Sequence, residues 1–226
     1  MDLKNIYVVG DVHGCYHTLN VLIASLPQYA ELIFVGDLCD KGNFTKEVIE
    51  LVIQKGWRSL RGNHEDLMMQ YVDDPSSKWA NDPQFGGSKT LASYGDDKET
   101  LVHHLRWSKT LPTYIIIENF FITHGFGLPY YERRDEEVYQ KALKNNRYSM
   151  KKKWSHEWEV YKEYPIINIH GHDYRRKGEA MEENIINLDT GCVYGKRLSA
   201  ISLETLEIIS VECDPRDREE YHEHYS

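Results

Sequence analysis

This chain of 226 residues has few cysteines, no long apolar run and fewer basic than acidic residues. The four cysteines, at positions 15, 39, 192 and 213, form no Cys-x-x-Cys pair, which excludes a zinc ribbon and a thioredoxin-like motif. The longest apolar runs, such as residues 114–117, are far too short to span a bilayer. The 27 Lys and Arg residues are outnumbered by 36 Asp and Glu residues, and the resulting net charge of −9 argues against a general nucleic-acid binder.

The remaining composition is that of a globular protein. Hydrophobic residues make up 41% of the chain and charged residues 28%, a balance that excludes disorder and leaves enough apolar surface for a sizeable core. We expect one domain over residues 1–212 and a charged, frayed tail over residues 213–226. Because the first ten residues do not resemble an export signal, we expect a cytoplasmic protein with reduced cysteines and no membrane partner.

The first 64 residues repeat one plan of strand, loop and helix. Short apolar runs at residues 6–9, 32–35 and 57–60 predict strands, and apolar residues at helical spacing lie between them. The repeat of about 26 residues is typical of β-α-β units, which form a parallel sheet. Each predicted strand ends in a polar cluster: Gly10-Asp11-Val12-His13-Gly14, then Gly36-Asp37, then Arg61-Gly62-Asn63-His64-Glu65. Because ligands bind beyond the carboxyl ends of parallel strands, we expect the fold to bring these clusters together.

The rest of the chain reads as helices and further strands. We expect an irregular stretch over residues 73–95 with a short helix near residues 88–94, then a helix that exposes His103 and His104. A β-hairpin over residues 113–117 and 120–123 leads into His124-Gly125. The remaining predictions are a helix at 136–143 and strands at 166–169, 185–188, 198–203 and 206–211, the first of which leads into His170-Gly171-His172.

The polar residues at these strand ends are a plausible set of metal ligands. They are Asp11, His13, Asp37, Asn63, His64, His124, His170 and His172. Carboxylate, amide and imidazole groups without thiolates suit Mn²⁺, Fe²⁺ or Zn²⁺. The set exceeds what one tetrahedral ion needs, and a carboxylate can bridge two ions, so it indicates a site for two metals. Two such ions, about 3.5–4 Å apart, favour in-line displacement at phosphorus and lower the pKa of bound water to ~7.

The three polar clusters, with Gly36-Asp37 extended to Gly36-Asp37-Leu38-Cys39-Asp40-Lys41-Gly42, resemble the signatures of the phosphoprotein phosphatase family of calcineurin-like metallophosphoesterases. Residues 86–95, Leu111-Pro112, His124-Gly125, Gly171-His172 and residues 188–198 are similar to the compact bacterial and phage members. The resemblance covers residues 5–205. It implies an α/β fold in which two packed mixed sheets are flanked by helices.

The resemblance also implies a role for each site residue. Asp11 and His13 would hold the first metal, Asp37 would bridge both, and Asn63, His124 and His172 would hold the second. His64 would be the general acid, Asp40 would orient it, and Arg61 would bind phosphate. His170 is the alternative to His172, which we prefer because it follows a glycine.

The sequence departs from the family pattern where phosphate would bind. Lys41 stands where arginine is usual, and a point charge grips phosphate less firmly than a planar guanidinium. In Trp154-Ser155-His156, the histidine takes the place of a second arginine. We therefore expect Arg61, Lys41 and His156 to form a looser phosphate pocket.

The expected activity is that of a metal-dependent phosphoprotein phosphatase acting on phosphoserine and phosphothreonine, with phosphotyrosine as a further substrate. A hydroxide activated by two divalent ions, Mn²⁺ before Fe²⁺ or Zn²⁺, would attack phosphorus directly. Symmetrical hydrolysis of diadenosine tetraphosphate at the same site is the alternative, and a non-catalytic binding module is the third hypothesis. The substrate is thus a phosphoprotein or a small phosphoester, and the oligomeric state stays open.

Overall fold

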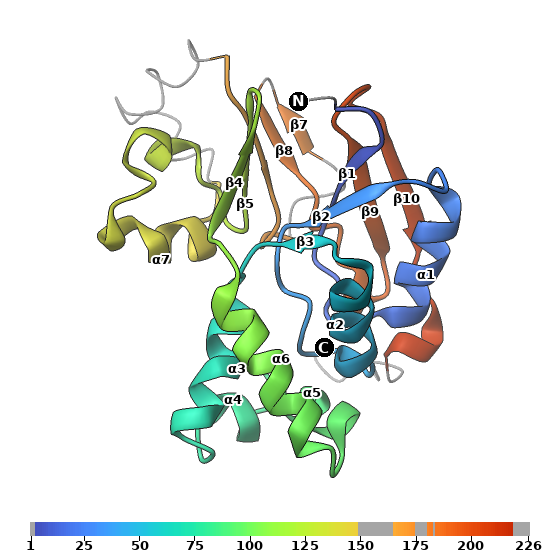
Figure 1. Ribbon diagram of the computed structural model, residues 1–226, viewed down its shortest axis with the longest axis vertical. Coiled ribbons are helices and arrows are strands. Elements are labelled where there is room, and N and C mark those ends of the chain that lie inside the picture. Colours follow the sequence, from blue (N-terminus) through green and yellow to red (C-terminus); the bar gives the residue numbers. More distant parts are fainter. Residues whose placement is uncertain (1–2, 149–164, 175–179, 183, 219–226) are drawn as a thin grey trace, which may run out of the picture.

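The computed structural model describes residues 3–148, 165–174, 180–182 and 184–218, and they form a sandwich of two sheets flanked by helices (Figure 1). The first sheet has the strand order β10-β9-β1-β2-β3, and the second has the order β4-β5-β6-β8-β7. The first sheet consists of β1 (Ile6–Val9), β2 (Glu31–Phe34), β3 (Arg58–Ser59), β9 (Arg197–Ser202) and β10 (Ile208–Glu212). The second consists of β4 (Tyr114–Ile117), β5 (Phe120–Thr123), β6 (Ile167–His170), β7 (Ala180–Glu182) and β8 (Ile185–Asn187).

Both sheets are mixed, as the family resemblance implies. Strands β1, β2 and β3 run parallel, which confirms the β-α-β prediction, whereas β9 is antiparallel to both β1 and β10. In the second sheet β5, β6 and β8 are parallel, and the edge strands β4 and β7 are antiparallel to their neighbours. Six parallel strands therefore direct their carboxyl ends toward loops that carry polar residues.

An apolar core fills the space between the two sheets. Val8 and Ile33 from the first sheet belong to the same buried cluster as Ile122, Ile169 and Ile186 from the second. Their side chains alternate with residues that face the outer layers, as expected for strands buried on both faces. This shared core fixes the position of one sheet relative to the other, and with it the positions of the loops at their ends.

Helices flank the sandwich, and those of residues 63–110 form a group below the sheets in the view of Figure 1. The helices are α1 (Tyr16–Ser25), α2 (Thr45–Lys55), α3 (Asn63–Asp73), α4 (Lys78–Asn81), α5 (Gly87–Tyr94), α6 (Lys98–Thr110) and α7 (Glu137–Asn145). Short 3₁₀ helices among the described residues are η1 (Leu128–Arg133), η3 (Cys192–Tyr194) and η4 (Pro215–Asp217). Helices α1 and α2 pack on the first sheet through a second buried cluster, and α7 with η1 packs on the second sheet through a third. Within the described residues, no helix is both long and apolar enough to cross a membrane.

The structure corrects three sequence predictions. Helix α3 begins directly in the third polar cluster, and α4 lies inside the stretch predicted to be irregular. Neither helix was predicted, because both begin in sequence that is rich in turn-forming residues. His104 is buried, not exposed, and its ring bonds to the Tyr94 hydroxyl at 2.7 Å and to Glu50 at 3.0 Å. The start of the predicted tail is also ordered, because the buried Asp217 carboxylate accepts bonds from backbone N–H groups at the start of α1.

Candidate active site

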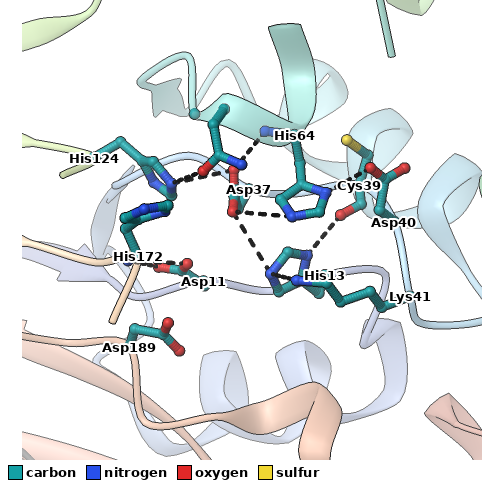
Figure 2. A network of polar contacts seen from close by, with 12 residues as sticks. Asp11, His13, Asp37, Cys39, Asp40, Lys41, His64, His124, His172 and Asp189 are labelled. Carbon is teal, nitrogen blue, oxygen red and sulfur yellow. Dashed lines mark hydrogen bonds and ion pairs between the residues drawn. The ribbon is translucent and has the colours of Figure 1, made fainter. Parts of the chain in front are cut away.

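The carboxyl ends of strands from both sheets meet at one polar cluster, which is centred on Asp37 (Figure 2). From the first sheet come Asp11 and His13 after β1, Asp37 after β2, and Asn63 and His64 at the start of α3 beyond β3. From the second sheet come His124 after β5, His172 after β6 and Asp189 after β8. The structure thus confirms that the fold brings the polar strand ends together.

Asp37 is buried and its two carboxylate oxygens face different partners. Oδ1 accepts a bond from the backbone N–H of His64 at 3.0 Å and lies 3.2 Å from Nε2 of His124. Oδ2 lies 3.6 Å from Nε2 of His13. The carboxylate therefore stands between two groups of histidines, the position required of a bridging ligand.

Two groups of ligand atoms share Asp37. One group is His13, Asp37 and His64, the other is Asp37, His124 and His172, and within each group the ligand atoms lie within 4.8 Å of one another. Oδ1 of Asn63 lies 3.0 Å from Nε2 of His124. The Asp11 carboxylate accepts the backbone N–H of His172 at 3.1 Å. All six predicted metal residues are thus adjacent in space.

The pKa values of the carboxyl and imidazole groups in the cluster favour the binding of a cation. Burial and the charge of Asp189 raise the pKa of Asp11 well above its usual value, and burial raises the pKa of Asp189 to about 6. Burial also lowers the pKa of His13, and together with the charge of His124 it lowers the pKa of His172 to about 3. Crowded buried carboxylates beside neutral imidazoles form a donor set that fits divalent metal ions.

Two positive charges partly compensate the carboxylates. Burial opposes protonation of His124, but the charge of Asp37 raises the pKa of His124 to about 9. The Lys41 ammonium lies 3.2 Å from Nε2 of His13. Burial works against this charge, but Tyr194 and Asp37 raise the pKa of Lys41. Lys41 therefore borders the cluster, and its binding of phosphate stays a prediction.

Several residues of the site adopt the left-handed backbone conformation, which favours glycine. They are His13, Asp37, Asp40, Lys41 and His172, with φ values of 47°, 52°, 72°, 69° and 66°. Non-glycine residues in this region are strained by about 1–3 kcal/mol each and persist where the surrounding structure holds them. The glycines that flank the motifs were the available signal for this strain.

His64 forms a separate hydrogen-bonded chain beside the Asp37 cluster. Its Nδ1 donates to Oδ2 of Asp40 at 2.6 Å, and Trp79 Nε1 donates to the same oxygen at 2.8 Å. The Thr90 hydroxyl donates to Oδ1 of Asp40 at 2.7 Å. These bonds fix the imidazole so that Nε2 faces Asp37, at 4.0 Å from Oδ2. The expected pairing of His64 with Asp40 is present, but Trp79 and Thr90 were not predicted.

Glu65 was quoted in the third polar cluster but was given no role. It is buried, and its carboxylate accepts backbone N–H groups of Asp37 at 2.9 Å, Leu38 at 2.8 Å and Gly62 at 2.7 Å. It therefore ties the loop after β2 to the start of α3. Its position three residues after Gly62 was the available signal, because this is the spacing of a capping carboxylate.

The predicted phosphate-binding residues are dispersed. The Arg61 Nε atom lies 3.4 Å from Asp66, and the side chain lines a pocket of about 560 Å³ between α3 and α6 instead of the cluster around Asp37. His156 lies outside the described residues. Arg147 was not predicted, yet its charge contributes to lowering the pKa of His172, after burial and His124.

His172, not His170, faces the cluster. The His170 ring lies against Phe126, with centroids 5.7 Å apart, and its Nδ1 is 2.8 Å from the Gly171 carbonyl. The His172 ring centroid is 5.1 Å from that of His124. Strand alternation alone would place residues 170 and 172 on the same face, but β6 ends at His170 and the backbone turns at His172, whose φ is 66°.

A two-sheet sandwich whose strand ends gather carboxylates, histidines and an asparagine around one bridging aspartate has the architecture of a metal-dependent phosphoesterase. Residues 4–176 match the family model for calcineurin-like phosphoesterases, and the chain belongs to this family of hydrolases, which use a dinuclear metal centre.

Named relatives fall into two functional groups. The asymmetrical bis(5'-nucleosyl)-tetraphosphatase PrpE of Bacillus subtilis is 25% identical over 227 residues, covering 90% of this chain and 93% of its own. Serine/threonine-protein phosphatase 2 of Escherichia coli is 28% identical over 218 residues, covering 87% and 91%. A crystal structure provisionally assigned as a diadenosine tetraphosphatase superposes with a TM-score of 0.69 at 26% identity, covering 92% and 93%.

Proposed function

We propose that this chain hydrolyses phosphoester or phosphoanhydride bonds at the cluster around Asp37. The single observation that carries this proposal is the convergence of carboxylate, amide and imidazole donors on Asp37 beside a separately held His64. The proposed metal residues are Asp11, His13, Asp37, Asn63, His124 and His172. Two divalent ions bound there, with Mn²⁺ as the first choice, would lower the pKa of water and offset charge on the phosphoryl oxygens.

His64 supplies the proton to the leaving oxygen in this proposal. Its Nδ1 is bonded to Asp40, so Nε2 is the ring nitrogen that faces the cluster, at 4.0 Å from Oδ2 of Asp37. Asp40 orients the ring and balances the imidazolium charge, as in other carboxylate–histidine pairs. The His64–Asp40 pair is shielded from solvent, because Asp40 is buried and His64 is only 8% exposed.

Lys41 and Arg147 are the basic side chains that we propose for the phosphate oxygens. Lys41 already lies beside His13, and the charge of Arg147 contributes to lowering the pKa of His172. Arg61 would have to leave Asp66 to reach the same oxygens, and the contribution of His156 stays a prediction.

We propose a dinucleoside tetraphosphate as the substrate. The rings of Tyr174 and Tyr194 lie 4.2 Å apart, and Tyr194 also lies 5.6 Å from the Lys41 ammonium that borders the cluster. Half-buried aromatic rings next to a phosphate site stack nucleobases, at about 1–3 kcal/mol per base. The relatives named as asymmetrical tetraphosphatases support off-centre cleavage, in place of the symmetrical cleavage considered from the sequence.

A phosphoprotein phosphatase is the second candidate and was the first expectation from the sequence. The Escherichia coli relative with that name supports it, at 28% identity. The two candidates share every proposed metal residue and His64, so they differ only in what surrounds the cluster.

Parallel assays of diadenosine tetraphosphate and a phosphoserine peptide, with Mn²⁺ and with a chelator, separate the candidates. Chelator-sensitive formation of ATP and AMP from diadenosine tetraphosphate would support the tetraphosphatase, whereas two ADP molecules would indicate symmetrical cleavage. Faster release of phosphate from the peptide would favour the phosphatase. No chelator-sensitive turnover of either would favour a binding module.

Substitution of Tyr174 tests the nucleobase contact directly. We expect Tyr174→Ala to raise the KM for diadenosine tetraphosphate by about 5- to 100-fold, the loss of one stacked base, while turnover of p-nitrophenyl phosphate is unchanged. Tyr29→Ala is the matched control, because Tyr29 is 78% exposed and follows α1. Equal KM values for the Tyr174 variant and the wild type would rule out this contact.

A further inference from the structure

Three of the four cysteines, Cys15, Cys192 and Cys213, form a second cluster next to the loop that carries His13. Cys15 precedes α1, Cys192 begins η3 and Cys213 follows β10, so the three come from distant parts of the sequence. Their sulfur atoms lie within 4.8 Å of one another. Cys39, the fourth cysteine, is buried beside the polar cluster of Asp40 and Glu65 instead.

The surroundings of this cluster separate it from the phosphoesterase site. Cys15 and Cys192 are buried in the apolar core that α1 forms with the first sheet, and Cys213 is half-buried at its margin. The Cys15 thiol lies 3.8 Å from the His13 carbonyl, so it contacts the backbone of the loop that carries His13. None of the three cysteines belongs to the groups around Asp37.

We propose that Cys15, Cys192 and Cys213 form a binding site for one thiophilic divalent cation such as Zn²⁺. With Zn–S bonds of about 2.3 Å, the sulfurs of a tetrahedral site lie about 3.8 Å apart, so three sulfurs already within 4.8 Å need only small side-chain movements. Two cysteines would suffice for simple packing contact or a disulfide, but three converging sulfurs supply most of a zinc coordination shell.

Donor chemistry would then direct different ions to the two sites. Thiolates select soft or borderline ions such as Zn²⁺, whereas the carboxylate, amide and imidazole groups around Asp37 also accept harder ions such as Mn²⁺. Binding exchanges the thiol protons of the three cysteines for the ion and involves no change of oxidation state. Hydrogen bonds from Cys15 and Cys192 lower the pKa of Cys213, so one sulfur already favours the anionic form.

An ion at this site would hold the segment that follows β10 against the start of α1. Cys213 is followed by Asp214, whose backbone N–H donates to the Thr18 hydroxyl at 2.9 Å in α1. Asp217 then accepts N–H bonds from the start of the same helix. The proposed ion would link this segment to Cys15 and η3 through metal–sulfur coordination, and a chelator would remove this link but not the hydrogen bonds.

Cadmium titration of the reduced full-length chain tests the site through thiolate absorption, independently of turnover. Excess Mn²⁺ first occupies the site around Asp37, and Cd²⁺ is then added while the ultraviolet thiolate-to-cadmium charge-transfer band is recorded. We expect the band to saturate at one equivalent, to disappear on addition of Zn²⁺, and to be lost in Cys213→Ser. Cys39→Ser is the matched control and should keep the band at full amplitude.

A second measurement covers the case in which Cys213→Ser folds poorly. In the wild-type chain, Zn²⁺ should slow alkylation of Cys213 by iodoacetamide, read by mass spectrometry of the peptide that contains it. A band that never saturates, a band kept by Cys213→Ser, or alkylation that Zn²⁺ does not slow would overturn the proposal. Failure of every phosphoesterase assay would leave this result intact, because neither readout uses turnover.

Discussion

At the scale of single residues, the orientation of His64 depends on Asp40, which the motifs name, and on further neighbours to which they assign no role. The Asp40 carboxylate accepts a hydrogen bond from Nδ1 of His64. Trp79 donates to one oxygen of that carboxylate and Thr90 donates to the other. The sequence paired His64 with Asp40, but Trp79 lies in a stretch predicted to be irregular. A proton donor in the interior must be oriented by such contacts, which depend on tertiary packing and not on local sequence.

Replacing the proposed acid gives a direct prediction. We expect His64→Asn to lower kcat by about 10²- to 10⁴-fold, the usual contribution of general acid catalysis, with the larger losses for substrates with poor leaving groups. Metal content and melting temperature should stay close to wild type. The measurement is kcat across aryl phosphates of graded leaving-group pKa, with His103→Asn on the exposed face of α6 as the control. A loss of equal size for every leaving group would exclude His64 as the acid.

Asp189 gives a pH-dependent prediction for the metal-free protein. Burial raises its pKa to about 6, against ~3.9 in an unfolded chain, so the folded state binds the extra proton between these pH values. This contribution to stability is present below pH ~4 and is lost as the pH rises through about 6. Asp189→Asn should therefore stabilise the metal-free chain at pH 8 by roughly 1–3 kcal/mol and have little effect near pH 4.

Urea unfolding in a chelator at several pH values measures this difference. The asparagine keeps an oxygen for the Gly191 N–H, which Asp189 accepts at 3.1 Å, so the comparison isolates the charge. A stability difference that does not vary between pH 4 and pH 8 would contradict the burial argument.

At the scale of elements, the strand ends position the site through close backbone contacts. A Cβ atom at Gly171, directly after β6, would lie 1.9 Å from Oδ1 of Asp11 after β1. The two sheets therefore touch here at a position where only glycine fits. The Gly-His pair was recognised in the sequence, but the reason for its glycine is a contact between residues 160 positions apart.

Substitution of this glycine should separate metal binding from simple backbone strain. We expect Gly171→Ala to displace the Asp11 carboxylate and weaken Mn²⁺ binding by roughly 10- to 100-fold, the effect of disturbing a ligand's support. Gly56→Ala is the matched control, because Gly56 ends α2 at a φ of 64° with no heavy atom near its Cβ. It should cost about 1 kcal/mol of stability and leave the Mn²⁺ affinity unchanged, as read by isothermal titration calorimetry. Equal Mn²⁺ affinities in both variants would show that Asp11 tolerates the extra carbon.

Most elements could be predicted because their signals are local. The apolar run of β1 and the hairpin of β4 and β5 match the structure to within a residue. Helix α3 could not be predicted in this way, since its first residues are also the polar cluster and look like a turn. His104 was assigned to the surface for a similar reason, because burial of a polar ring is decided by its partners Tyr94 and Glu50. The resemblance supplied the residue roles that spacing alone left open.

At the scale of the whole molecule, the proposed metal centre links the two sheets of the sandwich. Asp11, His13 and Asp37 follow strands of the first sheet, whereas His124 and His172 follow strands of the second. The apolar core between the sheets ends at this edge, where buried carboxylates repel one another. Ions bound here would offset that repulsion and join the strand ends of the two sheets.

Metal removal should therefore lower the stability of the whole chain and not only its activity. A ligand present at a hundred times its Kd stabilises the folded state by about 2.7 kcal/mol, which for a chain of this size raises Tm by about 5–10 °C. We expect this rise between a chelator and saturating Mn²⁺ in scanning calorimetry, and we expect Asp37→Ala to abolish it because Asp37 belongs to both ligand groups. If Tm were constant over the Mn²⁺ range that restores turnover, the ions would not be joining the sheets.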